Sequence, residues 1–164
     1  MSDDAEVERK VAASLEELGV PFELMRIDPD FADTAAFCEK YGVSLDVSAN
    51  CVVVTGKRDG EARFAACVIL ATTRADVNGA ARRALDVRKA SFAPMDVAVA
   101  ETGMEYGGIT PLGLPADWPV YVDAAVAAAD RVVIGSGVRR SKLTVPGALL
   151  TRLPGATVIE GLGR

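Results

Sequence analysis

Residues 107–113 read GGITPLG, and among the segments of this sequence their residue types point most clearly to a ligand-binding site. Glycine reaches backbone angles that other residues avoid, whereas proline fixes φ and lacks an N–H group. Such a segment cannot continue a helix or a central strand, so we expect a stiff loop with a bare backbone. A ligand can approach main-chain N–H groups in such a loop, and those groups can hold an anion or a polarised carbonyl. A structural turn between two strands is the alternative interpretation.

Polar or glycine residues also stand where we expect several other strands to end. These residues are Asn50, Thr72, Thr73, Asp123, Gly135, Ser136 and Gly137. Strand ends of a mixed sheet can meet at one cleft, so these positions and the loop together form the candidate site. The glycines at 135 and 137 are not a dinucleotide fingerprint, because the third glycine and a following long helix are missing. A Walker sequence is also absent, so nothing supports nucleotide hydrolysis.

The 164-residue chain contains no histidine. This excludes Ser-His-Asp and Cys-His catalysis, histidine metal ligands and histidine acid–base chemistry. Its three cysteines, Cys38, Cys51 and Cys67, fit no metal-ligand spacing, and their odd number argues against a disulfide framework. We therefore expect no metal and no cofactor. Any chemistry must come from carboxylates, lysine, hydroxyls, backbone dipoles or groups of the substrate.

The net charge of −5 excludes a globally basic nucleic-acid-binding protein. Short basic clusters remain, and we expect each of them to be a solvated surface pair. The clusters are Lys57-Arg58, Arg82-Arg83, Arg88-Lys89 and Arg139-Arg140-Ser141-Lys142. No apolar run reaches the roughly 20 residues that span a bilayer. The acidic N-terminus does not resemble a signal peptide, so we expect a cytoplasmic protein with no membrane partner.

Several helices and strands must position the candidate residues. Apolar spacing and end signals predict helices over 3–18, 33–41, 73–85 and 94–103, a short helix or turn over 124–130, and a last helix over 146–153. Strands are predicted over 22–27, 50–55, 63–71, 88–92, 120–123, 131–134, 140–144 and 157–159, the last at a sheet edge. Residues 56–61 are predicted to be a hairpin loop, and Thr73-x-x-Asp76 resembles a capping box.

These elements mix without a regular βαβ alternation. The pattern favours an α+β fold with a mixed α/β sheet over a doubly wound fold. Half of the residues are apolar and only 5% are aromatic, so the core must be aliphatic. No linker or repeat divides the chain, and we expect a single domain over residues 1–164.

The order of the motifs resembles the YbaK/ProX/EbsC family, the free-standing relatives of the editing domain inserted in bacterial prolyl-tRNA synthetases. The motifs are VVV at 52–54, VILA at 68–71, Asp76-Val77 opening a helix, GGITPLG at 107–113, Val122-Asp123 and IGSG at 134–137. The resemblance covers about residues 5–160 and implies a mixed, partly barrel-like sheet surrounded by helices. It also implies hydrolysis in trans of the ester that joins a wrong amino acid to tRNA. The implied partner is the 3′ end of an aminoacyl-tRNA, and an aminoacyl-tRNA synthetase is a further candidate partner.

The resemblance also implies which residues form the site. The glycine loop lines the pocket for the aminoacyl end in this family, and the region around Asp123 and residues 135–137 matches the same pocket's wall. The implied catalytic residues are Asn50, Gly107 and Gly108, and the implied substrate-binding residues are Ile109, Thr110, Pro111, Asp123, Gly135, Ser136 and Gly137. Because an aminoacyl ester is already activated, backbone donors and a positioned water can suffice without a strong base.

One position departs from the family pattern. Many members carry a lysine in a V-x-K-[ST] pattern at the start of the first hairpin strand, where this chain has Ala49 and Asn50. Asn50 can donate and accept hydrogen bonds but carries no charge, so the family's lysine is not carried over. Arg88 or Lys89 is the other candidate source of charge. The departure supports an alternative function, a non-catalytic module that binds an aminoacyl-tRNA end, an amino acid or a protein partner. An unrelated hydrolase using Asp123 with Lys89 is a third interpretation.

Overall fold

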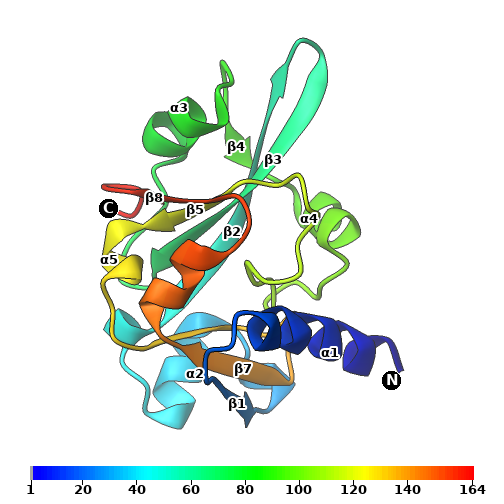
Figure 1. The fold of residues 1–164 in the computed structure, drawn as a ribbon, viewed down its shortest axis with the longest axis vertical. Coiled ribbons are helices and arrows are strands. Elements are labelled where there is room, and N and C mark those ends of the chain that lie inside the picture. Colours follow the sequence, from blue (N-terminus) through cyan, green and yellow to red (C-terminus); the bar gives the residue numbers. More distant parts are fainter. Residues whose placement is uncertain (1) are drawn as a thin grey trace.

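Two β-sheets with helices around them form the protein (Figure 1). The computed structural model describes residues 2–164. The strands are β1 (Glu23–Arg26), β2 (Ala49–Arg58), β3 (Glu61–Leu70), β4 (Ser91–Phe92), β5 (Val120–Asp123), β6 (Val132–Gly135), β7 (Ser141–Val145) and β8 (Ala156–Ile159). The α-helices are α1 (Ser2–Glu17), α2 (Thr34–Tyr41), α3 (Arg82–Leu85), α4 (Met95–Thr102) and α5 (Ala124–Ala127). Short 3₁₀ helices cover Pro29–Phe31, Leu45–Val47 and Gly147–Arg152, and a π-helical turn covers Val77–Ala81.

The larger sheet is mixed, with strand order β4-β2-β3-β5-β8. Its β4, β2 and β3 pair antiparallel, whereas β3, β5 and β8 pair parallel. The smaller sheet, β1-β7-β6, is antiparallel. A parallel bridge between Ser48, just before β2, and Val133 in β6 joins the two sheets. The predicted α+β fold with a mixed, partly barrel-like sheet surrounded by helices is confirmed.

The β2–β3 hairpin is longer than the sequence pattern suggested. Asp59 and Gly60 have φ of 52° and 78°, which forms a two-residue turn of the kind that matches the twist of paired strands. Pairing therefore continues to Arg58 opposite Glu61, and the prediction of a loop over 56–61 is wrong. The hairpin tip projects beyond the rest of the molecule (Figure 1).

The predicted helix over 73–85 begins later, because the capping residue is Asp76. Its Oδ2 accepts a hydrogen bond from the N–H of Ala80 at 3.0 Å. The Thr73 hydroxyl instead donates to the carbonyl oxygen of Leu70 at 2.8 Å. The capping-box prediction at Thr73 is therefore wrong, and a π-helical turn precedes α3.

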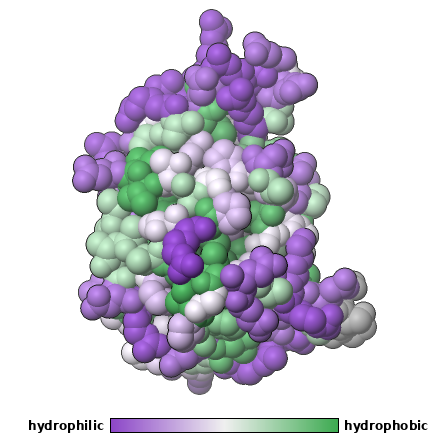
Figure 2. All heavy atoms as spheres, viewed as in Figure 1, coloured by the Kyte–Doolittle hydropathy of each residue, from purple (hydrophilic) through white to green (hydrophobic). Residues whose placement is uncertain are grey.

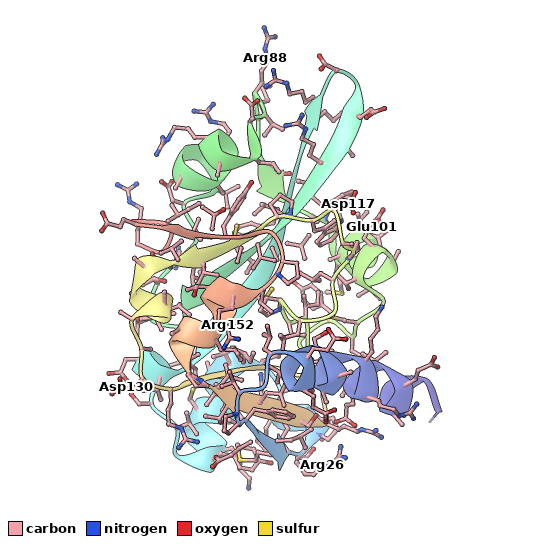
Figure 3. All side chains as sticks on the ribbon, in the orientation of Figure 1. Arg26, Arg88, Glu101, Asp117, Asp130 and Arg152 are labelled. Atoms are coloured by element: carbon pink, nitrogen blue, oxygen red, sulfur yellow. The ribbon has the colours of Figure 1, made fainter. Side chains whose placement is uncertain are left out.

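Other helix ends follow their sequence signals. Gly42 and Gly103 end α2 and α4 in the left-handed conformation, with φ of 67° and 72°. The last predicted helix is a 3₁₀ helix, Gly147–Arg152, and its Arg152 donates a hydrogen bond to the carbonyl oxygen of Leu18 at 3.1 Å. Figure 3 shows Arg152 between this helix and α1.

A buried carboxylate fixes α1 to the smaller sheet. Glu8, 7% exposed, accepts hydrogen bonds from Arg26 at 2.8 Å, from Arg140 at 2.7 Å and from the hydroxyl of Ser141. Burial by itself raises the pKa of the Glu8 carboxyl. Hydrogen bonds from Ser141 and the two arginines outweigh this effect, so the pKa lies below its ordinary value of 4.5.

Hydrophilic residues cover the projecting hairpin and the α1 side, and apolar residues surface across the middle of the face in Figure 2. None of the helices within residues 2–164 combines the length and the apolar character that crossing a bilayer requires.

Candidate functional site

A cavity of about 240 Å³ lies between β2 and the glycine loop, and we call it the strand–loop cavity. One wall is polar and contains Asp33, Thr34, Asn50 and Lys142. Apolar side chains also line the cavity, and they include Val53, Phe92, Ala93, Ala98 and Ile109. A ligand with a polar end and an apolar side chain matches this division of the lining.

Two segments far apart in sequence form the loop side of the strand–loop cavity. The carbonyl oxygen of Gly108 accepts a hydrogen bond from the N–H of Gly137 at 2.7 Å, and that of Gly137 accepts from Glu105 at 3.0 Å. A Cβ on Gly108 would lie 2.6 Å from the carbonyl oxygen of Val138, and a Cβ on Gly135 would lie 2.7 Å from that of Gly108. Only glycine permits this approach of backbone to backbone. The glycines that the sequence pattern grouped with the loop are therefore those that hold it in place.

The loop leaves selected main-chain donors unused. Gly107 and Ile109 line the strand–loop cavity, and within residues 2–164 neither of their N–H groups donates to a protein acceptor. The N–H of Gly108 differs, because it donates to the carbonyl oxygen of Glu105 at 2.9 Å. The loop's free hydrogen-bond donors are therefore the N–H groups of Gly107 and Ile109, and not that of Gly108.

Asn50 begins the polar wall from β2. Its Oδ1 accepts a hydrogen bond from the hydroxyl of Thr34, the first residue of α2. This bond fixes the orientation of the amide, and it leaves the NH₂ group as a donor for a ligand. Asn50 and the loop residues Gly107 and Ile109 therefore line one cavity from opposite elements.

Lys142 enters the same polar wall from β7 and is 7% exposed. Its Nζ lies 5.3 Å from the centre of the Phe37 ring, within the range of a cation–π contact. Burial lowers the pKa of the Lys142 amine, although Cys38 and Asp33 act in the opposite direction. The prediction that the 139–142 cluster is a solvated surface pair is wrong for this residue.

Arg139 ties the glycine loop to the start of α2. Its guanidinium donates to the carbonyl oxygens of Tyr106 at 3.2 Å and Pro29 at 2.9 Å, and it pairs with Asp33 at 3.3 Å. Main-chain oxygens and one carboxylate thereby fix the rim of the strand–loop cavity.

Other predicted site residues lie outside the lining of the strand–loop cavity. Thr110 is fully buried, and its hydroxyl has no hydrogen-bond partner among the residues that the structure describes. Pro111 lines a separate pocket beside Trp118. Ser136 is 1% exposed, and its hydroxyl bonds to that of Ser141 at 2.7 Å. Gly137 holds the loop from behind through its hydrogen bond to Gly108.

Asp123 lies apart from the strand–loop cavity as well. It is 3% exposed at the end of β5, where a Cβ on Gly163 would lie 3.2 Å from its Oδ2. Lys89 is exposed and does not line this cavity, so the pairing of Asp123 with Lys89 has no geometric support. Arg88 projects at the far end of the molecule (Figure 3), and it too is absent from the cavity lining.

Cys51 also lines the strand–loop cavity without offering a nucleophile. Burial, with a smaller contribution from Cys67, raises the pKa of the Cys51 thiol far above its ordinary value of 9.0. The thiolate is the nucleophilic form of cysteine, so this residue is inert near neutral pH.

Sequence reasoning missed three of the polar-wall residues, which are Asp33, Thr34 and Lys142. In the sequence, Asp33 and Thr34 indicated only the start of a helix. Lys142 had a usable signal, because it stands inside the predicted strand 140–144 beside Leu143, where a lysine is unusual. A lysine in a buried strand marks the position as unusual, but the sequence does not show which cavity the side chain lines.

The comparisons with known proteins agree with this architecture. The model of the aminoacyl-tRNA editing domain matches residues 28–153. A candidate trans-editing enzyme for prolyl-tRNA synthetase has a similar structure, with TM-score 0.77 and 21% identity over 94% of this chain and 95% of that one. A hypothetical protein superposes with TM-score 0.82 and 22% identity, over 94% of this chain and 99% of its own. At these identities the structural likeness shows the fold.

The match over residues 28–153 includes β2, the glycine loop, β6 and β7, which together supply most of the cavity lining. It covers most of the chain, and it confirms the resemblance that the order of motifs indicated. The chain belongs to the aminoacyl-tRNA editing domain family.

Proposed function

We propose that the protein is a trans-acting deacylase that hydrolyses the ester of a mischarged tRNA in the strand–loop cavity. The observation that carries the proposal is the meeting of Asn50, Gly107 and Ile109 at one amino-acid-sized cavity in a chain of the editing-domain family. The apolar lining accommodates the amino-acid side chain, and the polar wall faces the ester. The partner is then the 3′ end of an aminoacyl-tRNA.

The proposed chemistry relies on orientation and on hydrogen-bond donors. The N–H groups of Gly107 and Ile109 and the amide NH₂ of Asn50 are donors that can hold the ester carbonyl oxygen. A water molecule held near the carbonyl carbon then attacks it, and the ribose oxygen leaves. Positioning of the reactants can supply a large part of the rate for an activated ester, which is consistent with a chain that has no histidine.

The size of the strand–loop cavity sets which amino acid is removed. A difference of one methylene provides only about 1–3 kcal/mol of discrimination, so a second, editing pocket adds selectivity to that of a synthetase. The synthetase that misacylates the tRNA is the source of the substrate, and we place the protein with translation in the cytoplasm.

Binding without turnover is the second candidate function. It is favoured by Asn50, an uncharged residue at the strand start where many family members carry lysine, and by the inert thiol of Cys51. In that case the same cavity holds an aminoacyl-tRNA end or an amino acid and releases it unchanged.

A panel of mischarged tRNAs incubated with the protein separates the two functions. We expect ester hydrolysis above the buffer rate for at least one amino acid, and a loss of roughly 10²-fold in the Asn50→Ala variant, the typical effect of removing one oxyanion donor. The matched control is Asn78→Ala, because Asn78 is exposed and outside the strand–loop cavity. Binding of the panel without any hydrolysis would favour the second function.

A further inference from the structure

Lys142 is a largely buried side chain whose amine faces the strand–loop cavity and whose protein neighbours do not account for its position. Its side chain is 7% exposed and lines the strand–loop cavity. Among the side chains described, those of residues 4–164, no carboxylate forms an ion pair with it, and no protein acceptor takes a hydrogen bond from its amine. Asp33, a carboxylate whose charge acts on Lys142, directs its Oδ1 to Arg139 at 3.3 Å.

An ammonium group in this position is costly unless something compensates its charge. Lysine is among the residues that are almost never fully buried without a partner. The Phe37 ring, 5.3 Å from Nζ, compensates only part of the desolvation. Such a group is retained most readily where a ligand supplies the missing negative charge or lone pair.

The neighbours of Lys142 indicate which end of a ligand it meets. It shares the polar wall with Thr34 and Asn50, and it pairs in register with Gly135, which also lines the cavity. The apolar lining residues come from β2, from the segment of β4 and α4, and from the glycine loop; they include Val53, Phe92, Ala93, Ala98 and Ile109. The amine therefore meets the polar, reacting end of an aminoacyl group, and the side chain lies against the apolar residues.

We propose that Lys142 is a catalytic residue of the strand–loop cavity, whose ammonium group donates a hydrogen bond to the carbonyl oxygen of the bound aminoacyl ester. This inference rests on the proposed function. The positive charge at the site then comes from Lys142 in β7, since β2 begins with the uncharged residues Ala49 and Asn50.

The step is a hydrolysis that needs only water. The water oxygen bonds to the ester carbonyl carbon, and the electron pair of the C=O bond moves to the oxygen, where the Lys142 ammonium stabilises the negative charge. The attacking water gives a proton to solvent. The C=O bond then re-forms, the bond from the carbonyl carbon to the ribose oxygen breaks, and that oxygen takes a proton from solvent to become the terminal hydroxyl of the tRNA. The carboxyl group that has formed gives its proton to solvent, and the amino acid leaves as its carboxylate.

The test compares Lys142→Met with Lys142→Arg on the misacylated tRNA that the wild-type protein hydrolyses fastest. We expect Lys142→Met to lower kcat roughly 10²–10³-fold, because the oxyanion exists only in the transition state, and to raise KM about 10-fold, because the hydrogen bond to the ester carbonyl is already made in the bound substrate. Lys142→Arg should keep part of the activity. An unchanged kcat for Lys142→Met would overturn the proposal, and so would an effect confined to KM, which would indicate a contact to a tRNA phosphate instead.

Lys40→Met is the matched control. Lys40 also lies over an aromatic ring, with Nζ 5.2 Å from the centre of Phe31, but it is exposed and outside the strand–loop cavity. Its removal should leave kcat and KM unchanged. Thermal melts of the Lys142 variants establish that they fold, and we expect no loss of stability because Lys142→Met removes a buried charge.

A binding measurement keeps the inference separate from the proposed function. The probe is an aminoacyl-adenosine analogue in which an amide replaces the ester, since it offers the same carbonyl oxygen but resists hydrolysis. We expect Lys142→Met to weaken its binding about 10-fold or more, the size of a charge-assisted hydrogen bond. If no tRNA is hydrolysed but binding depends on Lys142, the deacylase function fails and the contact stands. Equal binding by wild type and variant would overturn the contact.

Discussion

At the residue scale, the polar wall of the strand–loop cavity is organised by few side chains. Thr34 donates its hydroxyl hydrogen to Oδ1 of Asn50 and thereby sets which end of the amide is available to a ligand. Thr34 is a positioning residue in this account, since it acts through Asn50.

Removing the Thr34 hydroxyl should reduce activity without removing the amide. We expect Thr34→Val to lower kcat/KM for the best misacylated tRNA by roughly 10-fold, about the worth of one hydrogen bond. Thr34→Ser should restore most of the rate because it returns the donor. A loss in Thr34→Ser with none in Thr34→Val would show that the Thr34 methyl group, and not its hydroxyl, matters.

The buried hydroxyl of Thr110 should contribute nothing to stability. It has no hydrogen-bond partner among the side chains and backbone groups that the structure describes. Replacing an unsatisfied hydroxyl by a methyl group of similar shape removes a desolvation cost, so Thr110→Val should leave the free energy of unfolding unchanged or raise it by up to about 1 kcal/mol. Urea denaturation measures this quantity. A clear loss of stability would mean that Oγ1 makes a bond that this structure lacks.

At the element scale, the glycine loop and the turn after β6 depend on close backbone contact. A Cβ on Gly135 would lie 2.7 Å and 2.8 Å from the carbonyl oxygens of Gly108 and Ile109. The elements must separate to admit it, which displaces the donors of the loop.

Gly135→Ala should therefore lower both stability and activity. We expect a loss of about 1–3 kcal/mol in the free energy of unfolding, the typical cost of overpacking, together with a lower kcat. Gly19→Ala is the control, since Gly19 has φ +68° but no atom within 4 Å of the added Cβ. The control should lose some stability and keep its rate per folded molecule. A Gly135→Ala variant with wild-type kcat would contradict the account of the loop.

The attachment of α1 should depend on pH through Glu8. Its pKa is lower in the folded protein than the ordinary 4.5, so its stabilising contribution is fully present above about pH 4.5 and is lost as the pH falls through the folded value. Glu8→Gln should lose about 1.5–3 kcal/mol at pH 7. The difference from wild type should shrink in more acidic buffer, as followed by urea denaturation.

Glu6→Gln serves as the control on the same helix, because Glu6 is exposed. Its removal should change the free energy of unfolding little at any pH. A Glu8→Gln penalty that stays constant between pH 7 and pH 3 would show that packing, and not the carboxylate, holds α1.

At the scale of the whole molecule, local signals predicted most of the helices and strands, whereas the candidate site depends on how these elements come together. The left-handed glycines at the ends of α2 and α4 were readable because such signals act within a few residues. The hairpin length was misjudged because the Asp59-Gly60 turn was not distinguished from a longer loop. The sequence grouped Asn50 with the glycine loop, and the structure brings Asn50, Gly107 and Ile109 to the strand–loop cavity.

The rest of the site depends on long-range geometry. Lys142 reaches the cavity because β7 pairs with β6 in one register and a bridge at Ser48 brings β6 beside β2. No local pattern encodes that arrangement. The N–H of Gly108 was expected to be a donor to the substrate, but the turn at Glu105 already uses it. Which backbone N–H groups of the loop stay free for a ligand can be seen only in the folded structure.

Hydrolysis at the strand–loop cavity is most directly tested by filling that cavity. Ala93→Phe places a large side chain among the lining residues, whereas Ala148→Phe adds the same side chain at an exposed position of the 3₁₀ helix. Single-turnover release of the amino acid from the best misacylated tRNA measures the rate in both. We predict that Ala93→Phe abolishes release and that Ala148→Phe matches wild type. Release at the wild-type rate by folded Ala93→Phe would contradict the account.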